Sequence, residues 1–98
     1  MSIGTAEQPV ELPAVADLTF ARTLKELLAT GLAAGKGLAI DASKVQRIGS
    51  PCLQVLVSAS NACVQAGGSK PAFLNPSTDF LETVALLGLD SELGLGRQ

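Results

Sequence analysis

The sequence contains no histidine, no tryptophan and no tyrosine, and its aromatic residues are three phenylalanines. Without histidine, the chain cannot supply an imidazole for acid–base catalysis or for metal ligation. The net charge is −2 at pH 7, so the chain offers neither the basic surface nor the stacking rings that nucleic acid requires. We therefore expect no nucleic-acid partner, no metal and no cofactor.

Charged residues and long hydrophobic runs are also scarce. Charged residues make up 16% of the 98 positions and hydrophobic residues 47%, a balance that argues against disorder and predicts one folded domain. The apolar runs stop well short of the ~18 residues that a membrane span needs. The first eight residues lack the basic and apolar regions of a secretory signal. We expect a cytoplasmic protein with no direct membrane insertion.

The two cysteines, Cys52 and Cys63, fall in one predicted helix. Their separation along its axis would be about 16 Å at ~1.5 Å per residue. A disulfide needs Cα atoms within ~7 Å, so we expect two free thiols. Neither a CxxC motif nor a histidine supports a redox or nucleophilic role, and burial in the core is the simpler interpretation.

The hydrophobic pattern alternates between strand-like and helix-like segments. It predicts strands at 10–12, 38–41 and 71–74 and a further short segment at 45–48. It also predicts helices from 18 or 20 to about 33, at about 51–66 and at about 78–87. Strand 10–12 is bracketed by prolines, which favours an edge position or a strand end, whereas the apolar run 38–40 favours an interior strand. This order indicates an α/β layered fold with a small, mostly parallel sheet and helices packed against it. We place a mobile segment at 1–8, the domain at 9–93 and a tail at 94–98, within a polar stretch that starts at Asp90.

Helix ends carry their own signals. Asp17 or Thr19 is a candidate N-cap for the first helix, and glycines at 35 and 37 would end it. Ser50 is a candidate N-cap for the second helix because Pro51 suits the first helical position. Ser77 is a candidate N-cap for the third, and Gly88 suits its left-handed end. We expect the third helix to turn four residues inward: Phe80, Leu81, Val84 and Leu87.

From position 10 to position 93, the chain resembles a STAS domain, the fold of bacterial anti-sigma-factor antagonists. Residues 38–43, Leu-Ala-Ile-Asp-Ala-Ser, match a strand of the type apolar-x-apolar-Asp-x-Ser. Residues 47–56 match the loop that opens a leucine-rich helix, and residues 86–90, Leu-Leu-Gly-Leu-Asp, match the end of the last helix. The resemblance implies a non-enzymatic regulatory module that binds other proteins.

The loop before the second helix departs from the family pattern of Asp, two small hydroxyl residues and Gly. Gly49 stands at the Asp position, Ser50 at the first hydroxyl, Pro51 at the second and Cys52 at the Gly position. The resemblance places the usual phosphoacceptor where Pro51 stands, and proline cannot accept phosphate. Ser50 remains the candidate phosphoacceptor, with helix capping as the simpler role. Constitutive binding, or binding under another input, fits this loop better than a phosphorylation switch.

We predict a partner-binding surface made of the loop and of two strand-end acids. Asp17 and Asp41 have simpler roles as a helix cap and a turn residue. Leu53 and Val57 would add apolar contacts if they are exposed. The predicted surface comprises Asp17, Asp41, Gly49, Ser50, Pro51, Cys52 and Leu53.

The resemblance implies an anti-sigma kinase or a histidine-kinase-like sensor as partner. The alternative is a regulatory subunit that binds the ATPase of a bacterial lipid-transport ABC complex, and a homodimer is also compatible with the sequence. No histidine, Cys–His pair or convincing pair of carboxylates indicates catalysis, so we expect no enzyme activity.

Overall fold

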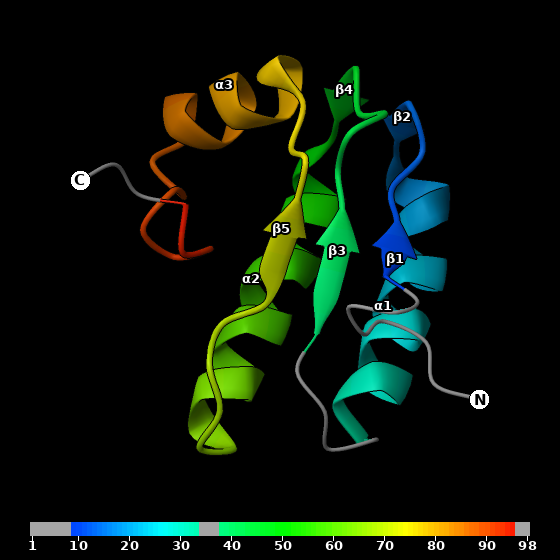
Figure 1. Cartoon of the computed structure of the whole chain (residues 1–98). Helices are drawn as coiled ribbons and strands as arrows, with labels where there is room; N and C mark the ends of the chain where they lie inside the picture. The colour runs from blue at the N-terminus through cyan, green and yellow to red at the C-terminus, as the bar shows by residue number, and fades with distance from the viewer. Residues whose placement is uncertain (1–8, 34–37, 96–98) are drawn as a thin grey trace.

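The computed structural model describes residues 9–33 and 38–95 (Figure 1). The predictions for residues 1–8 and for the glycines at 35 and 37 therefore lie outside the described residues. Strands and helices alternate in the order β1 (Val10–Glu11), β2 (Val15–Ala16), α1 (Leu18–Ala33), β3 (Ala39–Asp41), β4 (Arg47–Ile48), α2 (Ser50–Gln65), β5 (Ala72–Leu74) and α3 (Thr78–Leu86).

The strands form two small parallel sheets. In the first sheet the order is β1-β3-β5, so β3 is the interior strand and β1 an edge strand, as the sequence predicts. In the second sheet β2 pairs with β4. The register places Ile40 between Val10 and Phe73, which puts three apolar side chains on one face. The fold is the predicted α/β arrangement with parallel strands.

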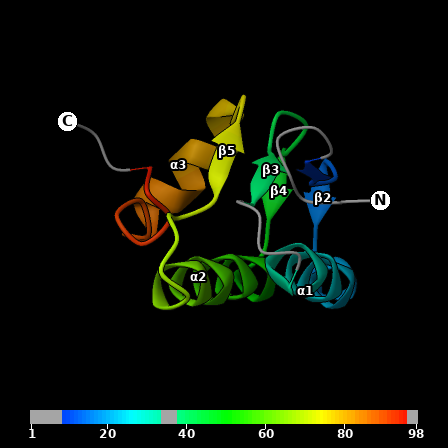
Figure 2. The same cartoon turned by 60° about the horizontal axis from the view of Figure 1, so that its bottom comes forward.

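Helices α1 and α2 lie side by side along one side of the strands, and α3 lies at the carboxyl end of β5 (Figures 1 and 2). No helix of the described residues is long and apolar enough to cross a membrane. Because all strands run in parallel, their carboxyl ends point the same way, toward the loops that lead into α1, α2 and α3. In α/β folds these loops are where binding sites gather.

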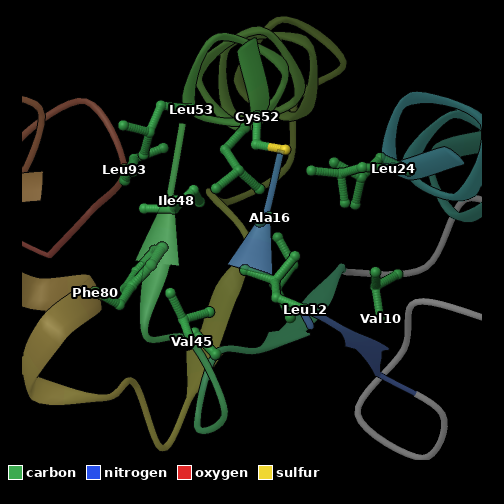
Figure 3. Packing of buried hydrophobic residues seen from close by; sticks show 14 of the residues in the cluster. Val10, Leu12, Ala16, Leu24, Val45, Ile48, Cys52, Leu53, Phe80 and Leu93 are labelled. Carbon is green, nitrogen blue, oxygen red and sulfur yellow. The ribbon is translucent and has the colours of Figure 1, made fainter. Parts of the chain in front are cut away.

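The core lies between the sheets and the helices, and Figure 3 shows its central part. It is built almost entirely from aliphatic side chains, with Phe80 as its one fully buried aromatic among the described residues. The Phe80 ring lies 5.5 Å from the ring of Phe73, in a tilted arrangement that ties α3 to β5. The labelled members are Val10, Leu12, Ala16, Leu24, Val45, Ile48, Cys52, Leu53, Phe80 and Leu93.

Helix α3 has the predicted ends. The Ser77 hydroxyl accepts a hydrogen bond from the Phe80 backbone N–H, 3.1 Å away, which confirms Ser77 as the N-cap. At the other end Gly88 has φ = 71°, and the Leu89 N–H bonds to the Val84 carbonyl at 2.9 Å, the pattern of a Schellman cap. The predicted inner face is only half right. Phe80 and Val84 are buried, whereas 40% of Leu81 and 52% of Leu87 is exposed, so α3 buries only a narrow stripe against the core.

The residues after α3 do not form the polar tail predicted from Asp90. Leu93 is completely buried, and the Ser60 hydroxyl of α2 donates a hydrogen bond of 2.9 Å to the Glu92 carbonyl. Lys70 donates another, of 2.6 Å, to the Ser91 carbonyl. This segment is therefore packed against α2 at least as far as Leu95.

Candidate functional site

The loops into α1 and α2 meet at the carboxyl ends of β2 and β4. The two strands pair in register, with Ala16 opposite Ile48, so the next residues, Asp17 and Gly49, leave the sheet side by side. The Gly49 N–H donates a 2.9 Å hydrogen bond to the Ala16 carbonyl and fixes this arrangement. Two of the predicted surface residues, far apart in sequence, are thereby brought together.

Asp17 is the N-cap of α1. Its Oδ1 accepts a hydrogen bond of 3.1 Å from the Phe20 backbone N–H, and its carbonyl oxygen accepts the Ala21 N–H at 3.0 Å. The capping interpretation is confirmed, and Thr19 lies inside the helix. The side chain is also exposed, so a partner can reach the Asp17 carboxylate at the start of α1.

The N-cap of α2 is Gly49 and not Ser50. Gly49 has extended backbone angles (φ −89°, ψ 163°), and its carbonyl accepts the first helical bond, from the Leu53 N–H at 3.2 Å. Ser50 and Pro51 are therefore the first and second helical residues, so α2 begins one residue earlier than predicted. Within the described part of the chain, no hydrogen bond engages the exposed Ser50 hydroxyl. The simplest structural role for Ser50 is thus absent.

Cys52 and Leu53 turn into the core and not toward a partner. The exposed fraction is 0% for Cys52 and 2% for Leu53, and both lie within the packed cluster in Figure 3. Burial, with a smaller contribution from the Asp17 carboxylate, raises the pKa of the Cys52 thiol above its usual value. The prediction that these two side chains contact a partner directly is therefore corrected: of the four loop residues, Gly49, Ser50 and Pro51 reach the surface.

A hollow of about 330 Å³ opens beside Ser50. It runs along α2 to the end of α3, and a half-buried valine, Val57, lines it as predicted, with Leu53 contributing its small exposed edge. Leu87 and Leu89 form the other wall, which sequence reasoning missed because it assigned Leu87 to the core and Leu89 to the helix cap. The lining residues are Ser50, Leu53, Gln54, Val57, Ser58, Leu87 and Leu89.

The comparison with protein-family models agrees with the α/β fold and parallel strands described above. Residues 2–96 match the family model STAS_2, described as "Mlab, STAS domain". The chain belongs to the STAS family. Searches of curated proteins and of solved structures returned no match. STAS domains are generally non-enzymatic regulatory modules that mediate protein–protein interaction.

Asp41 occupies a different part of this STAS domain. It ends β3, and its Oδ1 accepts the Ser43 backbone N–H at 2.9 Å, the turn role predicted from the sequence. Hydrogen bonds from the Ser43 hydroxyl and N–H lower the pKa of the Asp41 carboxyl. None of the hydrogen bonds found among residues 9–33 and 38–95 joins Asp41 to Asp17 or to the start of α2.

The described residues contain no group of three or more His, Cys, Asp or Glu side chains arranged to hold a metal ion. Cys63, the second thiol, is buried in the middle of the core, and burial raises its pKa. Both cysteines are free, as the sequence predicts. Neither thiol is therefore exposed at the start of α2, where the Ser50 hydroxyl and the Asp17 carboxylate are.

Proposed function

We propose that this STAS domain binds a regulatory protein partner at the start of α2, in the manner of an anti-sigma-factor antagonist. The observation that carries the proposal is the exposed Ser50 hydroxyl, which makes no hydrogen bond within residues 9–33 and 38–95 and lies beside an apolar hollow. A serine that capped its helix would be explained by stability alone. Ser50 caps nothing, and Gly49 has taken that role.

Apolar side chains on both sides of the start of α2 support the docking surface. On the α1 side, Leu18 follows the capping Asp17 and is 64% exposed. On the α3 side, Leu87 lines the hollow and is 52% exposed, and its neighbour Leu86 is 86% exposed. Large apolar residues gathered around a polar centre are typical of protein–protein interfaces.

The loop chemistry favours binding without a phosphorylation switch. Ser50 lies in the first turn of α2, where free backbone N–H groups and the helix dipole would stabilise a phosphate. The usual second hydroxyl is replaced by Pro51, and the usual acid by Gly49. A Cβ at Gly49 would meet Pro51 Cδ at 3.5 Å and the Ala16 carbonyl oxygen at 3.6 Å, which are ordinary contacts. The backbone therefore has room for a Cβ at this position, yet the chain carries no acid there, and the proposed partner binds unmodified Ser50.

The partner class divides into two candidates. An anti-sigma kinase or histidine-kinase-like sensor would fit the STAS resemblance. The ATPase of a lipid-transport ABC complex would fit a loop that has lost its second hydroxyl, because a permanently bound regulatory subunit needs no phosphoacceptor. The matching family model is described as Mlab and not as an anti-sigma-factor antagonist, and this description favours keeping the second candidate beside the first.

A quantitative pulldown from the native cell tests the proposal. Ser50→Asp places a carboxylate at the docking surface, and Ser69→Asp, in the exposed loop after α2, is the matched control. We expect Ser50→Asp to lower the amount of captured partner at least about tenfold and Ser69→Asp to leave it unchanged. Mass spectrometry of the captured protein then separates a kinase from an ATPase. Equal capture by the wild type and Ser50→Asp would refute docking at this loop.

A further inference from the structure

The outer side of α2 carries no charge at all. Residues 48–69, between Arg47 and Lys70, contain no acidic or basic side chain, although the helix has an exposed face along its whole length. Exposed helices in soluble proteins usually carry charges on their outer face. Depletion of charge, by contrast, is typical of the centre of a protein–protein interface.

A second hollow lies on this uncharged side, between α1 and α2. Its volume is about 370 Å³, and its walls are aliphatic and small side chains, with Lys25 at the α1 side as the one charged residue in its lining. Gln54 and Ser58 line this hollow and also the hollow beside Ser50. The two hollows are therefore neighbours, and Gln54 and Ser58, four positions apart on α2, form the ridge that they share.

The charges around this surface are unequal. In Figure 2, α1 lies beside α2, whereas α3 and the residues after it lie above α2, on the side of the strands. Between Pro71 and Leu95 every charged residue is acidic, and the set is Asp79, Glu82, Asp90 and Glu92. Asp90 directly follows Leu89, which lines the hollow beside Ser50. The Lys70 ammonium, which donates to the Ser91 carbonyl, lies at this border and offsets one of the four carboxylates. A partner that covers this hollow therefore approaches a border that is acidic on balance.

From these features we propose that the partner binds with a basic amphipathic helix, laid along the outer side of α2 with its apolar side chains in both hollows. Side chains one and two turns apart on such a helix reach two neighbouring hollows, and this is the usual way in which a helix binds a groove. Its basic residues face the acidic segment after α3. The inference rests on the proposed function and extends its surface from Ser50 to the middle of α2.

Charge insertion at the ridge between the hollows tests this extension. Ser58→Lys places a charge on the exposed residue shared by both hollows, and Ser69→Lys is the matched control outside them. In the same pulldown, we expect Ser58→Lys to lower partner capture about tenfold and Ser69→Lys to leave it unchanged. Normal capture by Ser58→Lys, together with loss in Ser50→Asp, would overturn the extension and leave the proposed function standing. Normal capture by both variants would overturn both proposals.

Synthetic peptides supply a measurement that does not depend on the native partner. Two amphipathic helical peptides share one apolar face of leucine and alanine, and carry either lysine or glutamate at all other positions. By NMR titration, we expect the lysine peptide to shift the amide signals of Gln54 and Ser58, and Ser58→Lys to abolish the shift. The glutamate peptide should shift them much less, since it meets the acidic segment. Equal shifts from both peptides, or no shift at Gln54 and Ser58 from either, would overturn the proposal.

Discussion

The thiol of Cys52 donates a hydrogen bond to the backbone carbonyl oxygen of Asp17, with 3.1 Å between sulfur and oxygen. Asp17 caps α1 and Cys52 lies in the first turn of α2, so this contact joins the starts of the two helices. The Gly49 N–H bond to the Ala16 carbonyl closes the same junction from the strand side. These hydrogen bonds fix the starts of α1 and α2 relative to each other, so a partner that binds around Ser50 does not have to order them.

Replacing Cys52 by alanine should loosen this junction at a moderate cost. The Asp17 carbonyl also accepts the Ala21 N–H, so loss of the thiol leaves no unpaired acceptor. The cost is then mainly the small cavity in the core, and we expect Cys52→Ala to lower the free energy of unfolding by about 1 to 2 kcal/mol. Urea denaturation measures it. A loss below about 0.3 kcal/mol would show that the thiol contributes nothing to the junction.

Both thiols should resist modification in the folded protein. Burial raises the pKa of Cys52 and of Cys63 above the ordinary value of 9.0, so the reactive thiolate is scarce at pH 7 as well as inaccessible. Iodoacetamide at pH 7 should leave the native protein unlabelled and label two cysteines in urea, as counted by mass spectrometry. Rapid labelling of Cys52 in the native state would contradict its position in the core.

Sequence reasoning succeeded where a local signal decides the structure. The apolar run before Asp41 identified the interior strand, and Ser77 identified the cap of α3. The hydrophobic pattern alone did not reveal strand β2, because its two residues, Val15 and Ala16, are too few to show an alternation. The strand forms because β4 pairs with it, and Val15 and its partner Arg47 are 32 positions apart in the chain.

The sequence predicted which loop forms the candidate site, but not the cap of its helix or which of its side chains are buried. The Ser-Pro pair at 50–51 predicted a serine cap, but the backbone of Gly49 already has the extended conformation that starts α2. Burial of Leu53 follows from the way α2 packs on the strands, and burial of Leu93 from its fit between α2 and α3. Such contacts between distant segments leave no mark in a single sequence.

Two serines at the starts of helices should differ sharply in their effect on stability. The Ser77 hydroxyl accepts the Phe80 N–H and donates a 2.6 Å bond to the Val45 carbonyl, whereas Gly49 caps α2 in place of Ser50. We expect Ser77→Ala to cost about 1 to 2 kcal/mol and Ser50→Ala less than about 0.5 kcal/mol. Parallel urea denaturation decides this. A large cost at Ser50 would mean that its hydroxyl has a structural role after all.

Two leucines near the carboxyl end of the chain should likewise differ. Leu93 is fully buried among the core residues, whereas 86% of Leu86 is exposed. We expect Leu93→Ala to lower the free energy of unfolding by about 2 to 4 kcal/mol, since it empties a packed site. Leu86→Ala should change it by less than about 0.5 kcal/mol. Similar small effects of both variants would show that the segment after α3 separates easily from the core.

The turn after β3 should stabilise the folded protein slightly at neutral pH, and this stabilisation should disappear in acid. The Ser43 hydroxyl and N–H hold the pKa of Asp41 below its ordinary value of 3.8, so folding favours the carboxylate. The resulting stabilisation is complete above the unfolded pKa of about 3.9 and is lost as the pH falls through the lower folded pKa. Asp41→Asn replaces the carboxylate oxygen that accepts the turn hydrogen bond with an uncharged amide oxygen. This variant should therefore be less stable than the wild type by under about 1 kcal/mol at pH 7.

The difference in free energy of unfolding between the two proteins should shrink as the pH falls through the folded pKa, as urea denaturation would measure. An NMR titration of the Asp41 carboxyl gives the cause directly, with Ser43→Ala as the matched variant. Removing the hydroxyl should move the pKa of Asp41 back up toward 3.8, because the largest stabilising contact with the carboxylate is gone while the backbone N–H remains. A wild-type Asp41 that titrates above 3.8, or a pKa that Ser43→Ala does not raise, would contradict this account of the turn.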